Sequence, residues 1–321
     1  MLHRIRWSAG LAALLVFLVG CGGKPAQVVK TGGPLVVSST FKGEYPIKVV
    51  ATTGMVADLV RNVAGKHAQV TQLMGEGIDP HLYKPSSGDV STLNNADVIF
   101  YSGRNLEGKM GDLFVRMAGR KPTFAVTDYI EDQFILEDEE QHFDPHLWFD
   151  VSLWSKTVGV VRDVLKQFDP KHAAEYQANA DAYQQKLAAL HEYAKSQLAT
   201  IPKEQRVLVT AHDAFRYFGR AYDIEVRGVQ GISTESEASV KEINELVQFL
   251  ANRKIKAVFV ESSVSEKNVK ALIEGALKGR NHTVAIGGEL FSDAMGKDGT
   301  PEGTYEGMIR HNVDTIVKAL K

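Results

Sequence analysis

The chain has a single cysteine, Cys21, among 321 residues. An exported protein without a second cysteine cannot form an internal disulfide, so redox work and disulfide stapling are not expected. A basic excess is also missing, because 37 Lys and Arg face 39 Asp and Glu, a net charge of −2. No Lys/Arg stripe is interleaved with aromatics, and we therefore expect no nucleic acid among the partners.

Long apolar runs are absent after the N-terminus, and no later segment is expected to span a bilayer. The first residues carry His3, Arg4 and Arg6, followed by an apolar core at 11–19 that is too short to span as a mature helix. Residues 1–20 are thus predicted to be an export signal. Its end, Leu-Val-Gly-Cys, resembles the lipobox of bacterial lipoproteins, which implies that Cys21 carries lipid. The alternative is an ordinary secretory signal with an incidental cysteine.

Glycine and proline are missing between Pro170 and Pro202, which predicts one long helix over 169–202. Asp169 is expected to cap the first free N–H groups and Pro170 to occupy the first helical position. At 1.5 Å per residue the helix would span roughly 45 Å, enough to brace two domains, although a helix within one domain is the alternative. One apolar face follows steps of three and four residues: Tyr176, Ala180, Tyr183, Leu187, Leu190, Ala194 and Leu198.

Short β-rich runs alternate with helical stretches on both sides of this helix, after a polar Gly/Ser/Thr-rich tether at 21–45. We therefore predict an α/β fold of two lobes, 46–168 and 203–321, each a mainly parallel sheet flanked by helices and joined by one long rigid helix. Strands are predicted at 47–51, 68–73, 98–101, 123–126, 206–210, 224–229, 257–261 and 283–286. Helices are predicted at 56–63, 88–94, 109–117, 151–168, 214–221, 239–251, 265–277 and 304–320.

Three histidines and an aspartate lie where loops follow the predicted strands. His81 and His146 each end a copy of the triplet Asp-Pro-His, His212 follows the strand at 206–210, and Asp293 comes just after the last strand. Ligands in open α/β folds bind outside the carboxyl ends of the strands. The cleft between the lobes is therefore the expected site.

Three neutral imidazoles and one carboxylate, two groups from each lobe, would suit a first-row divalent metal. The proline before each of the first two histidines restricts the backbone and helps to hold a ligand in place. Asp79 and Asp144, which begin the two triplets, are predicted to orient the imidazole rings. From these residues alone, an exposed or hydrogen-bonded loop histidine remains the alternative at each position.

The mature chain resembles the metal-binding receptor lipoproteins of bacterial ABC importers for manganese, zinc and related ions. The resemblance covers essentially all of it and rests, besides the lipobox, on these motifs in family order: Asp-Pro-His-Leu-Tyr-Lys-Pro-Ser, Asp-Pro-His-Leu-Trp-Phe-Asp, Thr-Ala-His-Asp-Ala-Phe-Arg-Tyr-Phe, Phe-Val-Glu-Ser-Ser and Gly-Gly-Glu-Leu-Phe-Ser-Asp-Ala.

The resemblance implies that His81, His146, His212 and Asp293 are the metal ligands and that the long helix links the lobes. It further implies capture of the ion outside the cytoplasmic membrane, to which lipidated Cys21 anchors the chain, and delivery to an ABC permease driven by a separate ATPase. This chain has no Gly-x-x-x-x-Gly-Lys-Ser/Thr loop and is not that ATPase. We expect a monomer with no organic cofactor.

The choice between manganese and zinc depends on two departures from the family's usual patterns. Zinc receptors often carry a His-rich loop before the second ligand, whereas residues 131–143 are acidic with only His142. Manganese-dedicated members often have Glu as the third ligand, where this chain has His212. The affinity order of divalent ions favours zinc at nearly any such site. The sequence around His212 and Glu261 most resembles that of receptors for manganese or for both manganese and zinc, so we expect manganese, with zinc binding as well.

Other titratable residues are expected to be less specific. Glu261 ends a strand beside the cleft, and a role behind the ligands or in an ion pair is favoured over ligation. The acidic run at 137–140 is predicted to be a solvated loop, with weak attraction of cations as the alternative. For His142, the one specific role we consider is to pass metal to the site. Solvated side chains are predicted for the remaining candidates: His67, His172, His191, His282 and His311.

Two other functions compete with the receptor. An exported metal-dependent hydrolase is one, because an open His₃Asp site can activate water and Glu261 would be its base. However, the sequence has no His-Glu-x-x-His motif or nucleophile elbow. A surface adhesin is the other, supported only by the expected location.

Overall fold

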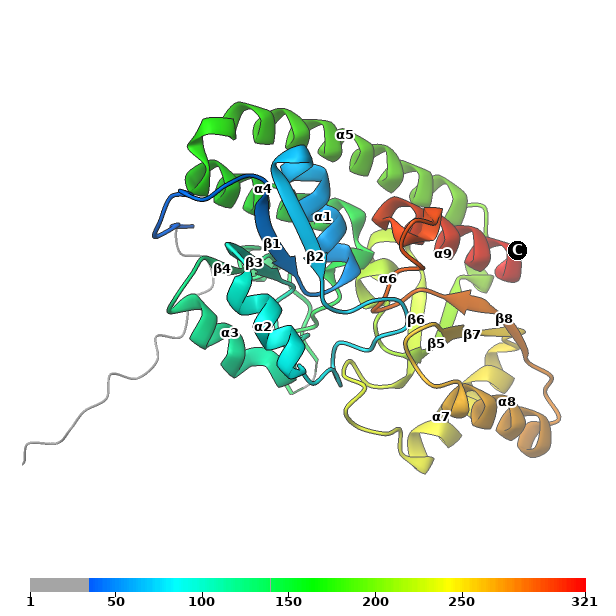
Figure 1. Cartoon of the computed structure of the whole chain (residues 1–321). Coiled ribbons are helices and arrows are strands. Elements are labelled where there is room, and N and C mark those ends of the chain that lie inside the picture. The colour runs from blue at the N-terminus through cyan, green and yellow to red at the C-terminus, as the bar shows by residue number, and fades with distance from the viewer. Residues whose placement is uncertain (1–34, 139) are drawn as a thin grey trace, which may run out of the picture. The chain divides into compact units, whose positions relative to one another are not determined.

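The computed structural model describes residues 35–138 and 140–321 (Figure 1). The predicted signal at 1–20, Cys21 and the tether as far as residue 34 lie outside the described residues. Within the described part, none of the helices combines the length and apolar character that crossing a membrane requires.

The first lobe is built on four parallel strands in the order β2-β1-β3-β4. Parallel strands are usually buried on both faces, and β3, the sequence Val-Ile-Phe-Tyr, lies inside accordingly. The strands are β1 (Ile47–Ala51), β2 (Ala68–Gln72), β3 (Val98–Tyr101) and β4 (Thr123–Ala125).

Helices cover this sheet with two separate groups of apolar side chains. The larger core includes Leu59 of α1 and Trp154 of α4, and the smaller one includes Leu93 of α2 and Phe114 of α3. The helices are α1 (Gly54–Ala64), α2 (Ser87–Asn95), α3 (Gly111–Ala118) and α4 (Val151–Phe168), with 3₁₀ turns η1 (Gly65–His67), η2 (Gly108–Met110), η3 (Asp132–Phe134) and η4 (Leu147–Phe149).

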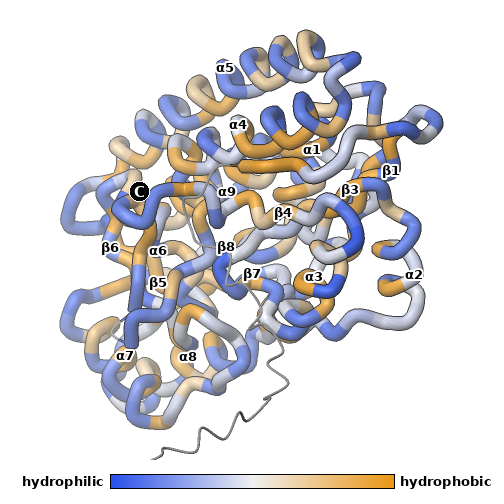
Figure 2. The backbone as a smooth tube through the Cα atoms, turned by 90° about the vertical axis from the view of Figure 1, so that its left-hand side faces the viewer, coloured by the Kyte–Doolittle hydropathy of each residue, from blue (hydrophilic) through white to orange (hydrophobic). Residues whose placement is uncertain are grey.

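The long helix α5 (Ala173–Leu198) runs along one side of both lobes (Figure 1). It packs against α1 and α4 of the first lobe and against α9 of the second. Figure 2 shows its polar and apolar residues alternating along the helix, as expected when only one face is buried. The buried residues are those of the predicted stripe: Tyr176, Ala180, Tyr183, Leu187, Leu190, Ala194 and Leu198.

The predicted start of this helix was wrong in one respect. A 3₁₀ turn, η5 (Pro170–His172), precedes α5, and Asp169 makes no side-chain cap to the backbone. Its carboxylate instead accepts hydrogen bonds from the hydroxyls of Tyr45 and Tyr176 and from Nδ1 of His172. Tertiary partners thus replace the predicted cap.

The second lobe has two parallel strand pairs, β5-β6 and β7-β8, with β5 packed beside β7. Its own core includes Val209, Val260 and Leu272. The strands are β5 (Val207–His212), β6 (Glu225–Gln230), β7 (Ala257–Glu261) and β8 (Ala285–Leu290). The helices are α6 (Arg216–Tyr222), α7 (Val240–Arg253), α8 (Lys267–Arg280) and α9 (Tyr305–Leu320), and the 3₁₀ turns are η6 (Lys203–Gln205) and η7 (Pro301–Gly303).

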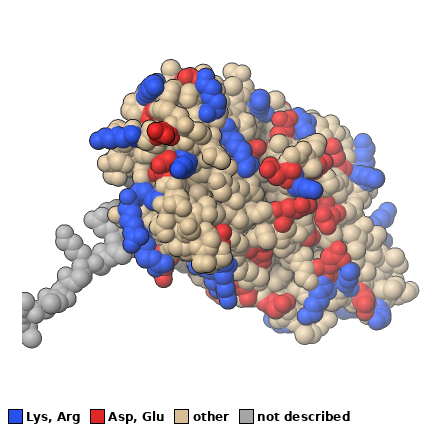
Figure 3. All heavy atoms as spheres, viewed as in Figure 1, with Lys and Arg blue, Asp and Glu red and all other residues tan. Residues whose placement is uncertain are grey.

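Acidic and basic side chains are interspersed on the face of the described residues shown in Figure 3. This agrees with the near balance of 37 basic and 39 acidic residues.

Candidate metal centre

The structure brings His81, His146, His212 and Asp293 together at one buried point between the lobes. Nε2 of His81 lies 3.4 Å from Nε2 of His146 and 3.4 Å from Oδ2 of Asp293. Nε2 of His146 lies 3.4 Å from Oδ1 of Asp293, and Nε2 of His212 lies 3.4 Å from Oδ2.

These separations match what a small divalent ion requires. Donor atoms about 2.1 Å from one centre at tetrahedral angles lie roughly 3.4 Å from one another. The carboxylate oxygens of Asp293 and Nε2 of His212 are buried and have no hydrogen-bond partner within the described part of the chain. A buried polar group without a partner is costly, and a cation bound here would satisfy all three atoms. The donor set therefore fits a divalent metal.

Each group reaches the centre from a loop or strand end. His81 lies in the loop between β2 and α2, which ends in a capping box formed by Ser86 and Asp89. His146 directly precedes η4, and the side chain of Asp150 then caps α4. A helix cap thus follows each of these two loops of the first lobe.

The second lobe supplies the other two groups at the ends of its strands. His212 is the last residue of β5, and Asp293 comes three residues after the end of β8. The cluster thus lies at the carboxyl ends of β5 and β8.

Carboxylates behind the cluster hold two of the rings. Nδ1 of His146 donates to Oδ1 of Asp144 at 2.8 Å, and Nδ1 of His212 donates to Oε2 of Glu261 at 2.5 Å. These bonds leave Nε2 of each ring for a metal, as in many metal sites. Asp144 and Glu261 therefore lie behind the rings of His146 and His212.

Asp79 differs from that prediction. Its Oδ1 accepts from the backbone N–H of His81 at 2.8 Å, and its Oδ2 accepts from Oγ1 of Thr234 at 2.6 Å. Asp79 thus fixes the backbone of the His81 loop and ties it to the second lobe, and the structure records no contact with the ring. The matching triplet sequences do not produce matching roles.

The buried charges shift the pKa values of the cluster in a consistent way. Burial alone would lower the pKa of His146, but Asp293 and Asp144 outweigh it and raise this pKa from 6.5 to about 9. Burial is likewise outweighed at His212, where Glu261 and Asp293 hold the pKa well above its usual range. Burial would raise the pKa of Asp293, but His212 and His146 keep it well below its usual range. Protons therefore compete with a metal for the imidazoles.

Sequence reasoning missed two residues of α6 that support this site across the lobes. The hydroxyl of Tyr217 donates to the backbone carbonyl of Asp144 at 2.9 Å, and Nη1 of Arg216 lies 3.6 Å from Oδ2 of Asp144. Both residues belong to the motif that contains His212, so the sequence does mark them. It does not show that their partner is Asp144 in the other lobe.

A hollow of about 740 Å³ lies beside the cluster, with His81 in its wall. Arg104 and His142 of the first lobe and Ser233 and Glu235 of the second also line it. The side chain of His142 is 70% exposed, and its Nδ1 lies 3.1 Å from Oδ2 of Asp138. Of the four clustered residues, His81 is the one in the lining of this hollow.

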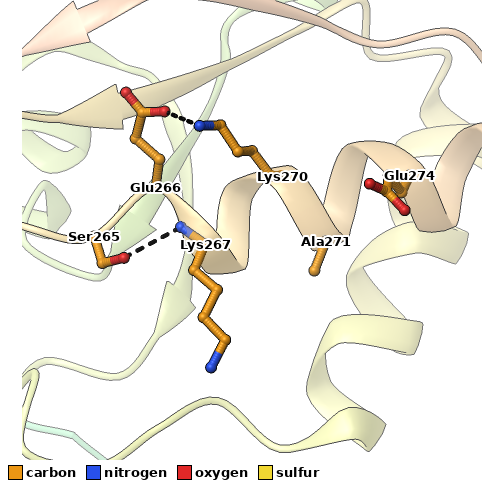
Figure 4. Close-up of a pocket in the computed structure, with 6 residues that line it drawn as sticks. All are labelled: Ser265, Glu266, Lys267, Lys270, Ala271 and Glu274. Carbon is orange, nitrogen blue, oxygen red and sulfur yellow. Dashed lines mark hydrogen bonds and ion pairs between the residues drawn. The ribbon is translucent and has the colours of Figure 1, made fainter.

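Another hollow, of about 660 Å³, lies at the start of α8 and serves as a contrast (Figure 4). Glu266 pairs there with Lys270, and Lys267 extends from the same helix. Its lining residues include no histidine. Charges that neutralise one another along one helix do not form a metal site.

The fold and this cluster define a class: a two-lobed α/β binding protein whose buried polar site suits a divalent metal. A family model described as "zinc-uptake complex component A periplasmic" matches residues 49–319. The chain belongs to this family.

Individual relatives agree with that assignment. The chain is 46% identical over 317 residues to the manganese-binding lipoprotein MntA of Bacillus subtilis, covering 97% of this chain and 99% of the relative. It is 52% identical over 272 residues to the zinc-binding protein TroA of Treponema pallidum, covering 85% and 88%. A solved structure of that periplasmic zinc-binding protein superposes with a TM-score of 0.83 at 51% identity, covering 85% of this chain and 99% of the other. Neither a hydrolase nor an adhesin is favoured by these relatives.

Proposed function

We propose that this chain is an extracytoplasmic receptor that captures manganese or zinc between its lobes and delivers the ion to an ABC permease. The family match and the manganese- and zinc-binding relatives support this function. The observation that carries it is the buried His₃Asp cluster, in which the nitrogen donors lie 3.4 Å from the carboxylate oxygens of Asp293. Among the described residues, these oxygens have no hydrogen-bond partner.

The proposed ligands are His81, His146, His212 and Asp293, with Asp144 and Glu261 orienting two of the rings. A set of three nitrogen donors and one carboxylate binds zinc more tightly than manganese on intrinsic affinity, so the ion carried in the cell depends on availability. We propose manganese as the physiological ion, with zinc bound as well.

Metal analysis of protein purified without added ions, followed by competition between manganese and zinc, tests this function. We expect about one ion per cluster and a loss of binding in Asp293→Ala. Asp298→Ala is the matched control, because Asp298 is exposed and lies five residues further along the same loop. If Asp293→Ala retains as many ions as the wild type, or if the protein turns over an ester or peptide and His212→Ala abolishes that turnover, a receptor that uses this cluster is contradicted.

We further propose that lipid on Cys21 anchors the chain to the outer face of the cytoplasmic membrane after removal of residues 1–20. The relatives named as lipoproteins support this proposal. Cys21→Ala should release the chain from the membrane fraction, and a variant that stays there and is still lipid-labelled would refute the assignment. The proposed parts of the chain are the tether 21–45, the lobes 46–168 and 203–321, and the link 169–202, in a monomer.

A further inference from the structure

A group of metal-binding residues that the proposed function does not use lies where η1 meets the start of α5. His67, His172 and Glu175 each place one candidate ligand atom within 4.8 Å of the other two. The rings of His67 and His172 stack with their centroids 3.8 Å apart, and Nε2 of His67 lies 2.8 Å from Oε2 of Glu175. His67 is 8% exposed, which contradicts the solvated side chain predicted for it.

His172 is held in the way that a metal-binding histidine usually is. Its Nδ1 donates to Oδ2 of Asp169 at 2.7 Å, and this carboxylate also accepts from the hydroxyls of Tyr176 at 2.6 Å and Tyr45 at 2.7 Å. A carboxylate behind one ring nitrogen fixes the ring and leaves Nε2 as the donor. Tyr45 also packs edge-on against the ring of His172, at 4.9 Å between centroids.

We propose that His67, His172 and Glu175 form a second site for a divalent cation of the zinc type, separate from the cluster between the lobes. Two imidazoles and one carboxylate, with water completing the shell, are an established donor set for such ions. The ion would replace the proton that His67 now shares with Glu175. Because bound donors lie roughly 3.4 Å apart and both lone pairs must point at the ion, the stacked rings must turn apart from one another and the exposed Glu175 must rotate toward them.

Lys66 opposes binding at this position. Its Nζ lies 3.4 Å from Oε2 of Glu175, and its side chain is 80% exposed. A divalent ion must therefore displace this ammonium group, so the second site should be weaker than the buried cluster. In the absence of a metal, the same three residues form a hydrogen-bonded contact between η1 and α5, which is the competing explanation.

Equilibrium dialysis of the full chain against zinc or cobalt, followed by elemental analysis, tests the proposal. We expect a second ion in the wild type, loss of that ion in Glu175→Gln and in His172→Ala, and retention of it in Asp293→Ala. Lys66→Ala should tighten the second site by about two- to fivefold, because the ion pair that it removes is exposed to solvent. His311→Ala is the control, because His311 lies on α9 and its ring pairs with the backbone carbonyl of Glu289 in β8.

The results separate this site from the buried cluster. If Asp293→Ala binds no ion at all, the second site does not exist, whatever becomes of the receptor function. If His67→Ala lowers the melting temperature while the count of bound ions and their affinities stay unchanged, the contact is only structural and the proposal is wrong. The exposed Glu175→Gln variant gives the same answer should His67→Ala fail to fold.

Discussion

Glu261 acts on the proposed ligand His212 at two points, because one carboxylate oxygen accepts from the backbone N–H at 2.9 Å and the other from Nδ1 at 2.5 Å. The first contact fixes the end of β5, and the second fixes the ring and its tautomer. The side chain is thus a positioning group, buried at 3% exposure and placed behind the donor atoms.

We expect Glu261→Gln to weaken metal affinity by about 10–100-fold, the usual effect of changing a partner behind a ligand. The amide keeps the shape but loses the charge that supports the imidazole. Titration in competition with a chelator measures the change. Glu274→Gln is the matched control, since Glu274 is exposed and pairs with Lys278 four residues on. Equal affinities for Glu261→Gln and the wild type would remove Glu261 from the site.

His146 predicts a distinctive pH dependence for the metal-free protein. Its pKa is about 9 in the fold against 6.5 ordinarily, so its ion pairs contribute stability that is complete below pH 6.5 and is lost as the pH rises through 9. The melting temperature without metal should fall across this window, whereas metal affinity should rise, because fewer protons compete. Calorimetry and metal titration at several pH values measure the two trends. A metal-free melting temperature that rises between pH 6.5 and 9 would contradict this account.

At the scale of elements, α5 is attached to the first lobe by a buried polar contact as well as by its apolar face. The hydroxyl of Tyr183 donates to Oδ2 of Asp58 on α1 at 2.7 Å. Burial raises the pKa of Asp58 above its usual value, although the bond from Tyr183 opposes this. The stability of the fold should therefore depend on the hydrogen bond that the hydroxyl of Tyr183 donates to the carboxylate of Asp58.

Tyr183→Phe should lower the free energy of unfolding by about 1–3 kcal/mol, because it leaves a buried carboxylate oxygen with one fewer donor. Tyr193→Phe provides a control on the same helix, because Tyr193 donates to Asp314 in an exposed pair. Tyr193→Phe should lower the free energy of unfolding by well under half the loss expected for Tyr183→Phe. Denaturant unfolding of both variants decides the point, and similar losses would show that burial of the Tyr183 contact is unimportant.

The turn η4 offers a probe of the metal centre. The ring of Trp148 lies 5.2 Å from that of His146 between centroids, and its Nε1 donates to the backbone carbonyl of Ser292, next to Asp293, at 3.1 Å. Metal should therefore change the fluorescence of Trp148, and Asp293→Ala should abolish the response. A response that persists in Trp148→Phe would come from Trp154, the other tryptophan after residue 20, and would contradict this assignment.

Elements were predictable from the sequence where their signal is local. The stripe of α5 and the span of α4 follow from helical periodicity, and β1, β3 and β7 from short β-rich runs. Asp169 and His67 were misjudged because their partners, Tyr45 and Glu175, lie 124 and 108 residues away. Local polarity made both positions resemble ordinary surface residues.

The candidate site was predictable to the level of residues but not of geometry. The repeated Asp-Pro-His triplet and the strand ends identified the four groups, since α/β folds gather such ends at one edge. The 3.4 Å spacing depends on how the lobes pack, as do the contacts of Asp144 with Tyr217 and Arg216. No pattern along a single chain shows those distances.

At the scale of the whole described molecule, several contacts join the lobes around the centre. The hydroxyl of Tyr305 donates to the carbonyl of Trp148 at 2.6 Å, and Nζ of Lys109 pairs with Oε1 of Glu235 at 2.5 Å. The helix α5 spans both lobes without an interruption in its 26 residues. Wide closure needs a flexible hinge, and a continuous packed helix does not provide one.

We therefore expect metal release to involve a small tilt of the lobes and a rearrangement of one ligand loop. His81 should leave first, because it lines the hollow and Asp79 holds only its backbone N–H, which leaves the ring freer to turn. His146 is held more firmly, since Asp144 binds both its backbone N–H and its ring. Distances between spin labels at Arg120→Cys and Lys278→Cys, in a Cys21→Ser background, measure the movement of the lobes with and without metal. A closure on the order of tens of degrees would refute the argument from α5 even if all four proposed ligands proved correct.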